Sequence, residues 1–272
     1  MTRPSTLPET ALAGLNGTAT QGEIIFTAAG CASCHSPADA TGADKLVLAG
    51  GQRFPSEFGT FIAPNISPDA QHGIGGWTQL QFTNAVIKGV SPNGQHYFPA
   101  FPYTSYNKMS LQDAADLWAY MQTLPANATP SQPHEVAFPF NIRRNLGGWK
   151  FLFLNDEWIL DASTPQLERG RYLVEALGHC AECHTPRNTL GGLDTTRWMQ
   201  GAPDPSGKGR VPGITPANLG WVEADITEYL TSGFTPEFDT AGGHMVNVIE
   251  NTALLRDQDR EAIAAYLLNL PN

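Results

Sequence analysis

The chain has 272 residues, of which 41% are hydrophobic and 15% are charged. It is long enough for two cores, because a domain typically takes about 150 residues. No run approaches the roughly 18 consecutive apolar residues of a membrane-spanning helix, and the net charge of −10 argues against binding to nucleic acid or to an anionic membrane surface.

The first 21 residues are expected to form an N-terminal extension. They contain neither a basic n-region nor an apolar core, so they do not have the features of a secretory signal. The 27 glycines and 21 prolines of the whole chain predict short helices joined by long loops.

The four cysteines occur in two copies of one motif, Cys-x-x-Cys-His. The first copy is Cys31 to His35 and the second is Cys180 to His184. Two thiols three positions apart in a helical turn can each bond to one vinyl group of a porphyrin. The histidine that follows can then bind the iron as its proximal ligand. The repeated motif therefore predicts two covalently bound haem c groups, held by Cys31, Cys34, Cys180 and Cys183, with His35 and His184 on the iron.

Other roles for the cysteines fit the motif less well. An even number of cysteines in an exported protein is often two disulfides. A Cys-x-x-Cys pair can also be a thioredoxin-like redox pair, and two such pairs can share one zinc ion. None of these roles requires a histidine at the same place after both pairs.

Further landmarks repeat in the same order after each motif. Residues 63–68 correspond to 211–216, Gly76-Trp77 corresponds to Gly220-Trp221, and the segment 113–120 corresponds to 259–266. Apolar residues at helical spacing predict closing helices over 111–124 and 258–270, with Ser110 and Asp257 as N-caps. We expect an all-α fold with two tandem class I-like cytochrome c domains and long loops.

The repeat also sets the expected domain boundaries. The first domain covers residues 22–125, a linker covers 126–164, and the second domain covers 165–272. The stretch 138–158 inside the linker is strongly aromatic, so we expect it to pack against both domains and fix their relative placement, with a docking surface for a partner as the alternative.

Several of these segments resemble the bacterial multihaem cytochrome c subunits of membrane-associated alcohol, gluconate and aldehyde dehydrogenases. The resemblance is carried by Phe58 to Asp69, Gly73 to Trp77, Tyr97 to Tyr106, and Arg169 to Asn188. Larger members of that group have a third haem domain and a membrane anchor, so the chain resembles a two-haem relative.

The second axial ligand of each iron lies outside the Cys-x-x-Cys-His motifs. For the second haem, Met245 follows a Gly-Gly loop long enough to reach the iron, and Met199 is the alternative. For the first haem, Phe101 occupies the corresponding place, where many members of the resembling group have methionine. Met109 then becomes the candidate, with His96 as its competitor and a purely structural Met109 as a further possibility.

The resemblance implies a periplasmic electron-transfer protein of a respiratory chain. Its donor would be a dehydrogenase and its acceptor a cytochrome or an oxidase, and its signal peptide would be absent from this chain. A dihaem redox enzyme of the peroxidase or thiosulfate dehydrogenase type, with an open or labile site at the first haem, is the alternative. A haem-based gas sensor would also need an open site.

Overall fold

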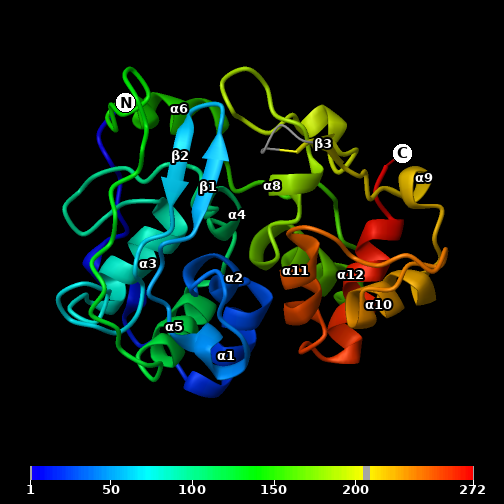
Figure 1. The fold of residues 1–272 in the computed structure, drawn as a ribbon, viewed down its shortest axis with the longest axis horizontal. Coiled ribbons are helices and arrows are strands. Elements are labelled where there is room, and N and C mark those ends of the chain that lie inside the picture. Colours follow the sequence, from blue (N-terminus) through cyan, green and yellow to red (C-terminus); the bar gives the residue numbers. More distant parts are fainter. Residues whose placement is uncertain (1, 205–208, 272) are drawn as a thin grey trace. The chain divides into compact units, whose positions relative to one another are not determined.

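The computed structural model describes residues 2–204 and 209–271, which form two compact units. The first contains residues up to 26 and residues 31–155, and the second contains residues 27–30 and those from 156 onward. Both are mainly helical, and Figure 1 labels most of their helices and strands. The expectation of a mostly helical fold is confirmed.

The first unit is built from short helices and one small hairpin. Its α-helices are α1 (Ala19–Ala28), α2 (Cys31–His35), α3 (Gln79–Lys88), α4 (Tyr103–Tyr106), α5 (Leu111–Met121) and α6 (Asn145–Phe153), and its 3-10 helices are Glu9–Leu12 and Gly42–Leu46. Strands β1 (Arg53–Ser56) and β2 (Gly59–Ile62) pair antiparallel, with Arg53 opposite Ile62.

The second unit repeats this plan with different lengths. Its helices are α7 (Pro165–Arg171), which continues as a π-helical turn (Tyr172–Leu177), then α8 (Ala181–His184), α9 (Pro216–Leu219), α10 (Glu223–Ser232), α11 (Met245–Thr252) and α12 (Asp257–Leu268), with a 3-10 turn at Thr195–Arg197. Strands β3 (Ala202–Pro203) and β4 (Arg210–Val211) form a second antiparallel pair.

In each unit a glycine lets the first helix approach the closing helix. A Cβ atom on Gly22 of α1 would clash with the Asp116 carbonyl oxygen of α5. A Cβ atom on Gly170 of α7 would clash in the same way with the Ala262 carbonyl oxygen of α12. The two helix pairs therefore cross at backbone contact, and the core of each unit forms around the crossing.

The closing helices lie close to their expected positions. Ser110 caps α5, and its side chain accepts a hydrogen bond from the Asp113 amide at 3.0 Å. The second cap is Arg256 rather than Asp257, because Asp257 is already helical and its carboxylate pairs with Arg260 one turn later. The helices end at Met121 and Leu268, a few residues before the following prolines.

The segment expected to be a linker is ordered and is divided between the units at Asn155. Glu135 forms a backbone bridge with Thr60 at the edge of β2. The Lys150 ammonium of α6 donates hydrogen bonds to the carbonyl oxygens of Lys88 at 2.6 Å and Gly89 at 2.8 Å, at the end of α3. Residues up to 155 therefore belong to the first unit.

No helix in residues 2–204 and 209–271 is both long and apolar enough to span a membrane.

Candidate haem-binding sites

Each cysteine motif lies in a short helical turn that brings its two thiols to one side. Helix α2 follows Gly30, which has a φ of +62°, and contains Cys31, Cys34 and His35. Residues three apart in a helix lie on the same face. All four cysteines are described, and none of them forms a disulfide.

The first thiol of each pair has a raised pKa. Burial raises the pKa of Cys31 and the pKa of Cys180 to about 12. A redox-active pair or a zinc site needs a thiolate, which a lowered pKa would favour. At neutral pH the Cys31 and Cys180 thiols therefore stay protonated when nothing is bound to them.

The two motif histidines make the same hydrogen bond in both units. The His35 Nδ1 atom lies 2.8 Å from the Pro64 carbonyl oxygen, and the His184 Nδ1 atom lies 2.8 Å from the Pro212 carbonyl oxygen. A carbonyl oxygen can only accept, so Nδ1 carries the proton and Nε2 keeps its lone pair. Burial also lowers the pKa of both imidazoles, which favours the neutral form that binds a metal.

A glycine that is hydrogen-bonded to each histidine leaves room for the loop whose proline carbonyl contacts the imidazole. The amides of Gly50 and Gly201 donate to the His35 and His184 carbonyl oxygens, at 2.7 Å in both cases. A Cβ atom on Gly50 would lie 2.5 Å from the Ala63 and Pro64 carbonyl oxygens. A Cβ atom on Gly201 would lie 2.7 Å from the Gly213 amide nitrogen. The donor set and its supports therefore fit a c-type haem in each unit.

Sequence reasoning did not identify the role of these supporting residues. Pro64 and Pro212 lie in the repeated segments 63–68 and 211–216, which were used only as landmarks of the repeat. The signal was present, because a proline follows the motif histidine at nearly the same distance in both units, 29 residues in the first and 28 in the second, which suggests a backbone carbonyl needed there. Gly50 and Gly201 gave no sequence signal beyond being glycines.

The distal candidates differ in their surroundings. Met245 is half-buried and is the first residue of α11, just after the Gly-Gly loop. Met109 is only 4% exposed and immediately precedes the N-cap of α5. Met199 is fully buried with a φ of +57°, in the loop that follows the 3-10 turn Thr195–Arg197.

His96 is held by parts of the first unit that are distant in sequence. Its side chain is buried, and the Nε2 atom lies 3.2 Å from the Thr2 carbonyl oxygen. The Arg143 guanidinium donates to the His96 carbonyl oxygen at 2.9 Å. The Nδ1 atom is buried without a hydrogen-bond partner.

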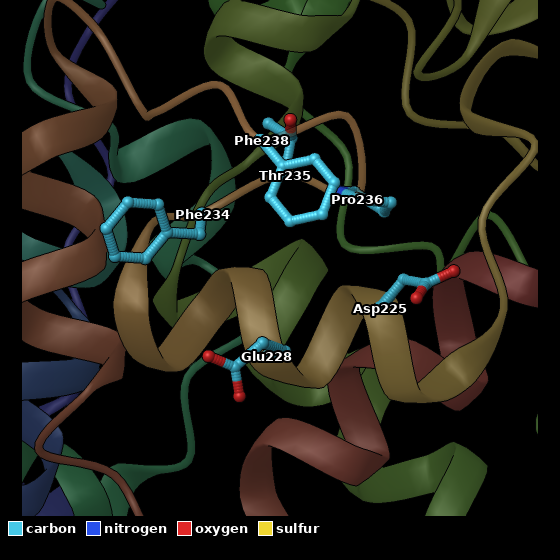
Figure 2. A pocket seen from close by; sticks show the side chains of 6 residues that line it. All are labelled: Asp225, Glu228, Phe234, Thr235, Pro236 and Phe238. Atoms are coloured by element: carbon cyan, nitrogen blue, oxygen red, sulfur yellow. The ribbon is translucent and has the colours of Figure 1, made fainter.

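The loop before Met245 surrounds a hollow of about 300 Å³ on the second unit. Figure 2 shows its lining, with the carboxylates of Asp225 and Glu228 on α10 and the residues Phe234, Thr235, Pro236 and Phe238 in the loop above that helix. Phe234 and Phe238 are 57% and 96% exposed. The hollow is therefore an acidic surface with exposed aromatic rings.

Comparison with known proteins gives a family match to both halves of the chain. The cytochrome c family model matches residues 19–125 and 167–271. The chain is 55% identical to a dihaem cytochrome c-type protein of Cereibacter sphaeroides over 272 residues, covering all of this chain and 92% of that protein.

Dehydrogenase subunits are also similar to it. The identity is 37% to the fructose dehydrogenase cytochrome subunit of Gluconobacter japonicus and 33% to the gluconate 2-dehydrogenase cytochrome c subunit of Pantoea cypripedii. Each alignment covers 92% of this chain, but only 52% and 59% of those two proteins. The chain thus spans little more than half the length of these subunits.

Proposed function

This chain belongs to the cytochrome c family, with the family's domain present twice, and from that premise we propose that it is an electron-transfer protein between a periplasmic dehydrogenase and a downstream cytochrome or oxidase. The dihaem relative and the dehydrogenase cytochrome subunits support this role. The two domains would be class I-like and cover residues 22–125 and 165–272.

The observation that carries the proposal is the repeated histidine geometry. His35 and His184 each follow a pair of thiols, and each has Nδ1 fixed on a proline carbonyl at 2.8 Å. When bound, a haem at each site supplies an iron that gains and loses one electron. The cysteines would fix the macrocycle to its helix, and the neutral imidazoles would hold the iron from the proximal side.

On the distal side, we propose Met245 as the ligand of the second iron. It lies at the N-terminus of α11 after Gly242 and Gly243, so a short flexible loop carries it. An iron with two protein ligands keeps its coordination when it changes oxidation state, which suits electron transfer more than substrate binding. A thioether ligand also raises the reduction potential.

The surface charge favours a redox partner with a basic docking face. Residues 211–255 contain six acidic side chains and no lysine or arginine. Two of these carboxylates line the hollow that also exposes Phe234 and Phe238. An apolar contact surrounded by charge of one sign attracts a partner of the opposite sign and still allows it to dissociate.

The test of the function begins with the mature protein from a host that assembles c-type cytochromes. Its mass should exceed the mass of the polypeptide by two haem groups. The bound iron should be reduced and reoxidised reversibly without turnover of peroxide or thiosulfate. Fewer than two added haems, or turnover of either substrate at enzymatic rates, would overturn the proposal.

A further inference from the structure

The two units contain the same hairpin, which follows helix α3 in the first unit and helix α10 in the second. Helix α3 ends at Gly89 and α10 ends at Gly233, both left-handed with φ of +58° and +78°. The Tyr97 amide donates to the Gly89 carbonyl oxygen at 2.8 Å, and the Ala241 amide donates to the Gly233 carbonyl oxygen at 2.8 Å. In each unit the bonded residues are eight positions apart, so the hairpins correspond residue by residue.

The isolated bridges give the same correspondence. Val90 pairs with His96 in the first unit, and Phe234 pairs with Thr240 in the second. Counting four residues onward from Tyr97 leads to Phe101, and four residues onward from Ala241 leads to Met245. The first unit therefore has an aromatic ring where the second has the thioether.

Counting backward from the closing helices shows which residue of the second unit corresponds to Met109. The N-caps Ser110 and Arg256 correspond, which places Met109 opposite Leu255. Both residues are buried, at 4% and 7% exposure. A residue just before an N-cap commonly packs on the first turn of its helix, and leucine has no atom that binds iron. Met109 thus occupies a position that the second unit uses for packing.

The segment between the hairpin and the closing helix is two residues longer in the second unit. Counting forward from the hairpin and counting backward from the closing helix therefore pair different residues. Counted backward, Met245 corresponds to Pro99, and counted forward, Met109 corresponds to Ala253. Neither count places a methionine of the first unit opposite Met245. The same repeat places His96 opposite Thr240, at a bridge position fixed by Thr2 and Arg143.

We propose that the first iron has no methionine ligand, because Phe101 stands in the place of Met245 and Met109 packs the helix start, so that the two haems are chemically unlike. A thioether raises the reduction potential of a haem. The haem that Cys31, Cys34 and His35 would hold is then the more reducing of the two. This inference rests on the proposed electron-transfer function.

The test uses the full chain with both haems attached. A methionine sulfur gives ferric c-type haem a weak red absorption band, which can be counted per haem. In the wild type we expect the intensity of one methionine-ligated haem for two haems bound. Met245→Leu should remove the whole band, and Met109→Leu should leave it unchanged.

The decisive variant is Phe101→Met, which should double the band. It should also raise the lower of two potentials resolved in a redox titration, while Met109→Leu leaves both potentials in place. Mass spectrometry on each variant shows whether both haems are still attached.

Loss of half the band in Met109→Leu, or a wild-type band with the intensity of two methionine ligands, would overturn the inference and leave the proposed function intact. A chain that binds fewer than two haems would instead overturn the proposed function, and with it the inference.

Discussion

The histidine of each Cys-x-x-Cys-His motif lies beside a glycine that passes close to the loop carrying its hydrogen-bond partner. Gly50 donates to the His35 carbonyl oxygen, and the space of its missing Cβ atom is taken by the carbonyls of Ala63 and Pro64. Pro64 accepts from the imidazole of the same histidine. The orientation of the imidazole and the packing of the glycine therefore depend on the same loop.

We predict that Gly50→Ala destabilises the protein more than Gly51→Ala. Both residues have positive φ, +74° and +95°, so both alanines meet a conformational cost of about 1 kcal/mol. Only the Cβ atom at position 50 also meets backbone atoms, whereas the one at position 51 has no heavy atom within 4 Å. Guanidinium unfolding should show an additional loss of about 2 kcal/mol for Gly50→Ala. Equal losses in the two variants would contradict the close approach seen at Gly50.

For individual residues, the sequence predicts those that lie close together in the chain. It does not predict the partners that they contact from distant positions. The pattern Cys-x-x-Cys-His fixes two thiols and an imidazole within one helical turn, so Cys31, Cys34 and His35 could be proposed without a structure. The partner of His35 lies 29 residues later in the chain, and no local pattern specifies that distance. His96 shows the same limit, because its contact with Thr2 joins residues 94 positions apart.

Among the elements, the crossing of the first and closing helices governs the stability of each unit. Gly22 and Gly170 lie where the backbones of α1 and α5, and of α7 and α12, touch. The neighbouring residues Tyr120 and Tyr266 would also meet an added Cβ atom. Tyr266 is fully buried, and its hydroxyl donates to the Glu175 carboxylate at 2.7 Å.

We predict that Gly170→Ala and Gly22→Ala each lower the free energy of unfolding by about 3 kcal/mol, because the helices must separate or bend to admit a methyl group. Gly148→Ala is the matched control within a helix, since nothing lies within 4 Å of its Cβ position. Alanine is a better helix former than glycine, so the control should gain about 0.5–1 kcal/mol. Thermal unfolding of the mature protein measures all three, and a destabilised control or an unchanged Gly170→Ala would refute the argument.

Elements with clear periodicity could be predicted, and α6 could not. Helices α5 and α12 have apolar residues at helical spacing and a capping residue or proline at their ends. Helix α6 contains two adjacent glycines, and several of its large apolar residues are exposed, such as Phe151 at 70%. Its attachment depends on the Lys150 ammonium at the end of α3, a tertiary contact that local propensity does not contain.

For the whole molecule, the repeat in the sequence predicts two similar units, and the charge pattern distinguishes between them. The chain carries a net charge of −10, and no lysine or arginine occurs from 211 to 255. That stretch includes α10, the hairpin with Phe238 and the start of α11. The charge could be counted from the sequence, but the gathering of carboxylates around exposed rings needed the fold.

We predict that electron transfer to a small basic cytochrome slows as salt is added. Opposite charges steer the encounter at low ionic strength, and added ions screen them once the Debye length shortens from about 30 Å to about 8 Å. Stopped-flow reduction of the partner should show a second-order rate at least about tenfold lower at roughly 150 mM than at roughly 10 mM salt. An acidic acceptor should not show this decrease.

Two pairs of substitutions locate the effect. Glu228→Gln with Glu237→Gln neutralises one acid that lines the hollow and one exposed acid between the lining residues Pro236 and Phe238, and Glu9→Gln with Glu57→Gln neutralises two exposed acids of the first unit. Both pairs change the net charge by the same amount, so a uniform field would give equal effects. We expect the first pair to lower the rate at low salt several-fold and the second pair to change it little, because steering depends most on charges near the contact. Equal effects of the two pairs would place the docking surface elsewhere.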